Sequence, residues 1–113
     1  MPGKTELVFP SLIYRGTLKG HAQLNRELTP EIAALEKIDD HGRRWGGEHY
    51  ENGYSSYSSM YRLHQTSPTF AELEKRLWPE VKAFIRKLNW DMTGRDLAMT
   101  TCWANSMGQG THH

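Results

Sequence analysis

The chain has 113 residues, 37% of them hydrophobic and 24% charged, which is enough for a single domain with a modest core. Its 14 Lys and Arg against 13 Asp and Glu give a formal charge of +1, too small to attract nucleic acid or an anionic membrane surface from a distance. The single cysteine excludes an internal disulfide, and the N-terminus has no apolar run typical of a signal peptide or membrane span, so we expect a cytoplasmic protein.

Residues 1–20 are predicted to form an extended N-terminal segment. Apolar side chains flank Pro10 on both sides. Proline has no backbone N–H to donate to a sheet, so the extended run should break there. Gly16 and Gly20 then loosen the chain before the first region with helical character.

That helical region covers about residues 21–39. Its clearest signal is Thr29-Pro30-Glu31, which combines a capping hydroxyl, a proline suited to the first helical position and an acid for the positive end of the helix dipole. A helix start in the middle of the region predicts two helical pieces that meet at Pro30.

Residues 40–67 show no sustained period and are rich in glycine, serine and aromatic residues. Such a long irregular connection is usually functional or disordered, and the dense rings favour an ordered loop packed over another part of the protein. On an extended backbone, Tyr54, Ser56, Ser58 and Met60 would alternate with the residues between them, so a short strand at 54–61 is also possible. The rings are Trp45, Tyr50, Tyr54, Tyr57 and Tyr61.

The strongest helical pattern predicts one long helix over residues 68–90. Its start is a cap at Ser67 or at Thr69, and these two alternatives remain open. Pro79 should kink the helix or restart it, because it removes one backbone hydrogen bond. The apolar stripe comprises Phe70, Leu73, Leu77, Val81, Phe84, Ile85 and Leu88.

A connecting turn at 91–96 leads to a predicted strand at 97–106, whose side chains alternate between a large face and a small face. Trp103 and Asn105 share the large face, and Cys102 lies on the small one. Two closely spaced glycines after Met107 then predict a sharp turn. We expect Cys102 to be a buried structural thiol, since no activating base is near it in the sequence.

The chain closes on His112 and His113, which an extended backbone would direct to opposite sides. The pair alone therefore does not form a chelating site. The other four histidines are scattered, without the spacing of a known metal motif, so surface or packing roles are favoured for them on residue chemistry alone. They are His21, His41, His49 and His64.

Three segments, GYSSYSSMYRLHQTSPTFAELE, KAFIRKLNWDM and TTCWANSMGQGTHH, occur in this order. Together they resemble a small bacterial and phage group of iron(II)- and 2-oxoglutarate-dependent oxygenases. The resemblance covers most of the chain from about Leu24 onward. The matching residues are Asp40, Gly42, Trp45, Gly53, Tyr54, Ser56, Tyr57, Ser59, Leu63, His64, Cys102, Trp103 and Asn105.

The resemblance implies an α+β chain comprising the N-terminal helices and first strands of a double-stranded β-helix, or jelly roll, truncated before the barrel closes. In that group a histidine-rich segment supplies iron ligands, and His113 falls where its first histidine would be. Asn105 would hydrogen-bond a cosubstrate or substrate oxygen, and Trp103 would wall the pocket. Ordinary core packing is the competing explanation for both side chains.

Iron in such a site takes two histidines and a carboxylate, leaving positions for the 2-oxoacid and oxygen. The resemblance thus implies Fe(II) and 2-oxoglutarate as cofactors and a small organic substrate for the complete enzyme. We expect residues 1–113, taken as a single partial domain, to lack most of that site and to be inactive alone. The alternative is a non-catalytic α+β interaction module whose aromatic segment at 45–61 packs on a partner.

Overall fold

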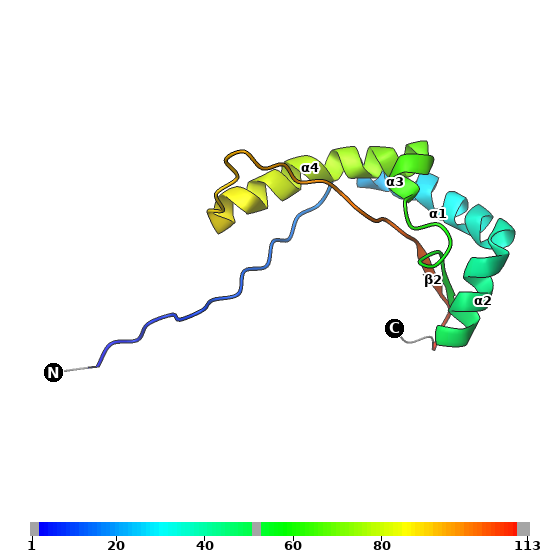
Figure 1. The fold of residues 1–113 in the computed structure, drawn as a ribbon, viewed down its shortest axis with the longest axis horizontal. Helices are drawn as coiled ribbons and strands as arrows, with labels where there is room; N and C mark the ends of the chain where they lie inside the picture. Colours follow the sequence, from blue (N-terminus) through cyan, green and yellow to red (C-terminus); the bar gives the residue numbers. More distant parts are fainter. Residues whose placement is uncertain (1–2, 51–52, 111–113) are drawn as a thin grey trace.

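The computed structural model describes residues 3–50 and 53–110 as a mixed α+β chain, mostly helical, with one two-stranded antiparallel sheet. Two long helices lie side by side, a third descends from one end of this pair, and the sheet packs against that third helix (Figure 1). The extents of 66 × 32 × 29 Å reflect an N-terminal arm that leaves the body of the protein.

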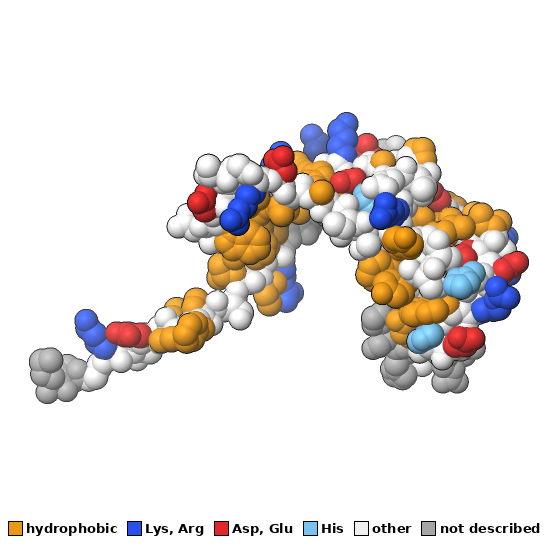
Figure 2. Space-filling view, in the orientation of Figure 1, with side chains coloured by type: hydrophobic (Ala, Val, Ile, Leu, Met, Phe, Trp, Pro, Cys, Tyr) orange, Lys and Arg blue, Asp and Glu red, His pale blue; other side chains and the backbone are white. Residues whose placement is uncertain are grey.

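The arm consists of residues 3–13, which form neither helix nor strand and expose apolar side chains such as Leu7 and Phe9. Figure 2 shows this apolar surface along the arm. Contact with the body begins at Tyr14, whose ring lies 5.6 Å from that of Phe84. The end of the segment is therefore anchored, while its first part has no covering layer among the described residues.

Helix α1 spans His21–Ile38 and passes through Pro30 without a break, so the expectation of two helical pieces is wrong. Proline cannot donate the bond to the carbonyl four residues earlier, which costs the helix one link. The Thr29 hydroxyl, predicted to be a cap, instead donates to the Asn25 carbonyl at 2.9 Å, as threonines inside helices do.

Helix α2 spans Asp40–His49, within the segment 40–67 for which the sequence predicts an irregular loop. The sequence pattern did not predict this helix because of its glycines, each of which disfavours a helix by about 1 kcal/mol. The fold requires two of them, since Gly42 and Gly46 are buried where strand β1 passes too close to admit a side chain. Tertiary packing therefore overrides propensity here.

Strand β1 (Gly53–Ser55) pairs antiparallel with β2 (Asn105–Met107). The strand predicted at 97–106 is thus mostly wrong in extent. Residues 97–104 have no ladder partner in the described chain beyond one parallel bridge, between Arg62 and Cys102. Alternation in sequence gives an extended backbone, but a strand also requires a neighbour to receive its hydrogen bonds.

A single turn of helix, α3 (Leu63–Thr66), leads into α4 (Pro68–Leu88). Ser67 caps α4 by accepting from the Phe70 N–H at 3.3 Å, which resolves the choice between Ser67 and Thr69. The helix continues past Pro79 without a restart and ends at Leu88. The next residue, Asn89, is left-handed and caps the helix by donating its N–H to the carbonyls of Ile85 and Arg86.

The core is small and lies at the N-terminal end of α4. Leu63, Phe70 and Ala104 form its buried cluster. These three residues come from α3, α4 and the segment before β2, so the core joins parts of the chain that are far apart in sequence. Partly buried side chains pack around the cluster, namely Leu28, Ile32, Leu35, Met60, Leu73 and Cys102.

The close approach of α2 and β1 can be tested with adjacent glycines. A Cβ at Gly46 would lie 2.7 Å from the Gly53 carbonyl oxygen, whereas a Cβ at Gly47 meets nothing within 4 Å. Gly46→Ala should lower the free energy of unfolding by about 1–3 kcal/mol through overpacking. Gly47→Ala should raise it by about 0.5–1 kcal/mol through helix propensity. Urea denaturation measures both, and equal effects would contradict the close approach.

Candidate functional site

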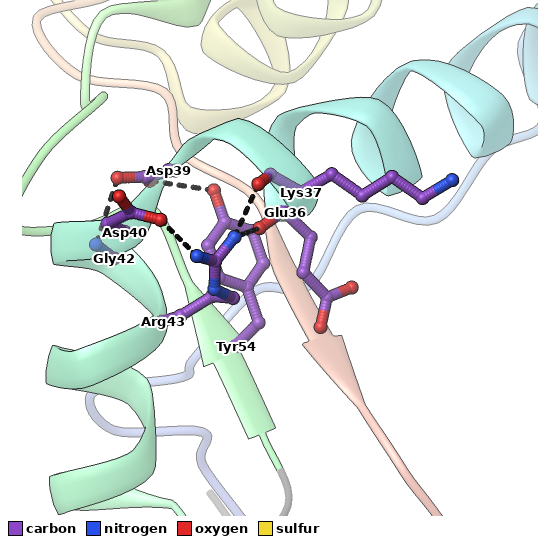
Figure 3. Close-up of polar contacts among 7 residues, drawn as sticks. All are labelled: Glu36, Lys37, Asp39, Asp40, Gly42, Arg43 and Tyr54. Carbon is purple, nitrogen blue, oxygen red and sulfur yellow. Dashed lines mark hydrogen bonds and ion pairs between the residues drawn. The ribbon is translucent and has the colours of Figure 1, made fainter.

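The candidate site is built on a buried carboxylate at the start of α2. Asp39 is 4% exposed, and its Oδ1 accepts the Gly42 N–H at 2.9 Å, which caps the helix. Its Oδ2 accepts the Tyr54 hydroxyl at 2.8 Å and the Ser59 hydroxyl at 2.5 Å. Figure 3 shows the first two of these bonds. One side chain thereby ties α2 to β1 and to the turn that follows β1.

The protonation states in this cluster follow from its hydrogen bonds. Burial alone would raise the pKa of Asp39, but the bonds from Ser59, the Gly42 amide and Tyr54 favour the carboxylate, and the net pKa is lowered. Burial and then the bond to Asp39 raise the pKa of Tyr54, so the phenol keeps its proton. The cluster is a charged acceptor surrounded by fixed donors.

Arg43 joins α2 to the end of α1. Its guanidinium donates to the carbonyl oxygens of Glu36 at 2.6 Å and Lys37 at 2.5 Å, and it pairs with Asp40 (Figure 3). These carbonyls belong to the last turn of α1, where no helical partner remains for them. Asp40, the aspartate matched by the resemblance, is exposed. The buried role therefore falls to Asp39, which sequence reasoning did not single out.

A second buried group, Ser56, holds the segment before β2. It is 0% exposed, its hydroxyl donates to the Met60 carbonyl at 2.8 Å, and that same oxygen accepts the Ala104 N–H at 2.9 Å. The Ser56 N–H in turn donates to the Ala104 carbonyl at 2.9 Å. Both backbone groups of Ala104 are therefore satisfied by this one serine.

The same segment is attached at two further points. His64 Nε2 lies 2.9 Å from the Met99 carbonyl oxygen, which can only accept, so this nitrogen is the donor. The Leu63 N–H donates to the Cys102 carbonyl at 3.1 Å, and the Cys102 N–H donates to the Tyr61 carbonyl at 2.8 Å. Residues 99–104 are thus held along one side without forming a regular strand.

The other side of this segment carries the two predicted pocket residues. Trp103 is 41% exposed and its ring meets that of Tyr57 at 5.0 Å, edge to face. Tyr57, itself 50% exposed, lies 5.4 Å from Trp45. Asn105 pairs with Ser55 in the sheet register and is exposed. Neither Trp103 nor Asn105 belongs to the buried core of the described residues.

The reactive side chains of the described residues do not gather into a metal centre. In residues 3–50 and 53–110, no three His, Cys, Asp or Glu side chains are placed to hold a metal ion. His49 stacks on Trp45 at 4.0 Å, far in the chain from the buried His64. Burial raises the pKa of Cys102, so its thiol stays protonated and poorly nucleophilic. The predicted iron ligand His113, with His112, lies outside the described residues.

Comparison of the chain with protein-family models, curated proteins and solved structures finds no match. The helices of the described part are too short or too polar to cross a lipid bilayer.

The hydrogen bonds of Asp39 predict how the free energy of unfolding depends on pH. Because the folded pKa lies below the ordinary value of 3.8, the unfolded chain binds this proton more readily. The resulting stability is complete above about pH 4 to 5 and is lost as the pH falls through the folded pKa. Asp39→Asn should lower the free energy of unfolding at pH 7 by about 1–3 kcal/mol and flatten this acid-side loss.

Urea denaturation between pH 7 and pH 3 measures both effects. The matched control is Asp40→Asn, which removes the neighbouring exposed carboxylate but leaves the Asp39 hydrogen bonds in place. This control should keep the acid-side slope of the unmodified protein. If Asp39→Asn also kept the slope, the charged-acceptor assignment would be wrong.

Proposed function

We propose that this chain is the N-terminal portion of an iron(II)- and 2-oxoglutarate-dependent oxygenase that hydroxylates a small organic substrate. The observation that carries the proposal is that residues of the resemblance, distant in sequence, contact one another. Gly42 packs on β1, the Tyr54 and Ser59 hydroxyls meet on one carboxylate, and Ser56 holds the segment that carries Trp103. Matching residues that pack together in one unit support the family resemblance better than matching residues scattered over the structure would.

The fold is compatible with the first strands of a jelly roll. The sheet has only β1 and β2 among the described residues, so each strand has one partner and one open edge there. Open edges of short strands are where further strands add. In the proposed enzyme, β2 and the extended residues before it would continue into the double-stranded β-helix.

Asn105 and Trp103 are assigned to the pocket because the opposite side of their segment is occupied by structural bonds. Their own side chains are exposed, and neither is required for the core. The Asn105 amide offers both a donor and an acceptor for a cosubstrate or substrate oxygen. Trp103, continued by Tyr57, offers a flat apolar wall.

The described residues do not fit iron binding by themselves, since they lack a group of two histidines with a carboxylate. The proposal therefore assigns ligation to His113 and to residues that this sequence does not contain. The chain's own contribution is to position Asn105 and Trp103. We place the protein in the reducing cytoplasm, because the one cysteine of this chain has no disulfide partner within it.

A non-catalytic interaction module is the second candidate. It is favoured by the ring contacts that run from Trp45 through Tyr57 to Trp103. The Tyr57 and Trp103 side chains are substantially exposed. Exposed aromatic rings are common at protein interfaces. This candidate expects a partner to cover the rings and no response to iron.

The test uses the protein isolated from its native source, so that the whole gene product is present. Anaerobic addition of Fe(II) and 2-oxoglutarate should produce a visible charge-transfer band, and the intact mass should exceed that of 113 residues. A native polypeptide of only 113 residues, with no band and a cooperative melt indifferent to iron, would overturn the enzyme and favour the module.

In that native enzyme, Asn105→Ala should weaken 2-oxoglutarate or substrate binding by about tenfold, the loss of one to two hydrogen bonds. The melting temperature should hardly change, because the side chain is exposed. Thr101→Ala, an exposed change on the same segment, is the matched control and should leave binding unchanged. Calorimetric titration with either ligand measures the difference, and equal affinities for the two variants would remove Asn105 from the site.

A further inference from the structure

A groove lies at the opposite end of α4 from the small core. It is formed by the C-terminal half of α4 and the connection at 92–97, and its volume is about 700 Å³. Figure 2 shows apolar side chains exposed beneath this end of the helix. The lining residues are Trp78, Lys82, Ile85, Arg86, Met92, Arg95, Asp96 and Leu97.

The lining combines an apolar floor with unpaired positive charge. Lys82, Arg86 and Arg95 against the single carboxylate of Asp96 leave a net charge of +2. Within residues 3–50 and 53–110, none of the three cations makes an ion pair or a side-chain hydrogen bond. Their donors are therefore available to a ligand without breaking a hydrogen bond or an ion pair, and Arg86 also interacts electrostatically with Tyr14.

The aromatic component of the groove is held in place. The Trp78 indole N–H donates to Glu74 at 3.0 Å, which restricts the ring to one orientation. A second hollow of about 550 Å³ shares Trp78, Lys82 and Arg86 and adds Lys75, so basic lining continues along the helix. A ring among cations is suited to ligands that are both flat and negatively charged.

We infer that this groove binds a small dianion with a flat apolar body, of which an aryl phosphomonoester is the simplest example. The anion would meet the Arg86 and Arg95 guanidinium groups, whose planar forks match phosphate oxygens. The apolar body would cover Trp78 and the aliphatic floor, as in small-molecule sites generally. A phosphomonoester carries nearly two negative charges at pH 7, which matches the lining.

This inference is independent of the proposed oxygenase. The groove uses none of the residues of the Asp39 cluster or of the Trp103 surface, and it lies at the other end of α4 from the sheet (Figure 1). Failure of one proposal leaves the other standing.

The probe is 1-naphthyl phosphate, titrated into the full chain by calorimetry, with inorganic phosphate and neutral 1-naphthol as comparators. The naphthyl phosphate should bind at least tenfold more tightly than either, because only it uses both components of the groove. Its affinity should fall as salt is raised. Equal affinities for the three compounds, or no binding of naphthyl phosphate, would overturn the inference.

Substitutions in and beside the groove test whether the ligand binds there. Arg86→Gln should weaken binding about tenfold through the loss of a charged hydrogen bond. Lys87→Gln makes the same charge change in the same last turn of α4, but Lys87 does not line the groove and its variant should bind normally. Asp96→Asn should tighten binding, an effect that damage to the fold cannot produce. If Arg86→Gln and Lys87→Gln weakened binding equally, or Asp96→Asn did not tighten it, the groove would not be the site.

Discussion

The arrangement of this chain depends on one buried charge. The Asp39 carboxylate is nearly inaccessible to solvent and has no ionic partner at hydrogen-bond distance among the described residues, yet it accepts three hydrogen bonds. A buried carboxylate is tolerated only when its acceptor sites are satisfied, and each donor here comes from a different part of the chain. The Gly42 amide comes from α2, Tyr54 from β1 and Ser59 from the following turn. Satisfying the charge therefore assembles the three elements, and their packing leaves no room for side chains on Gly42.

The position of the exposed aromatic surface follows from that assembly. Once β1 is held against α2, the next residue, Ser56, is placed to bind both backbone groups of Ala104. Side chains alternate along an extended backbone, so a buried Ala104 directs its neighbours Trp103 and Asn105 outward. The division between structural and exposed residues is thus set by the backbone bonds of one alanine. It explains why Cys102, Ala104 and Ser106 on the small face are partly or fully buried. Trp103 and Asn105 on the large face are exposed.

The sequence predicted those elements whose signals are local. The apolar stripe and the Ser67-Pro68 start place α4 correctly, because caps and helical spacing act within a few residues. It failed where contacts between distant segments decide. Helix α2 contains glycines that propensity penalises but β1 requires, and no local pattern reveals that requirement. The exposure of Trp103 was likewise hidden, since alternation identifies two faces but not which one is covered. Asp39 did have one local signal, because aspartate is a common residue immediately before a helix. There its side chain accepts the N–H three residues later, here that of Gly42.

The ends of α4 differ because a small chain cannot cover a long helix. Twenty-one residues at 1.5 Å each extend for about 32 Å. The buried cluster contacts the helix at Phe70, near its start, while side chains farther along its stripe, such as Phe84, remain only half buried. There Tyr14, at the anchored end of the arm, packs on Phe84, and the groove lies between the helix and the connection at 92–97. Apolar surface left uncovered beside unpaired cations is costly to the protein alone, and a ligand that supplies both an apolar body and negative charge relieves both costs.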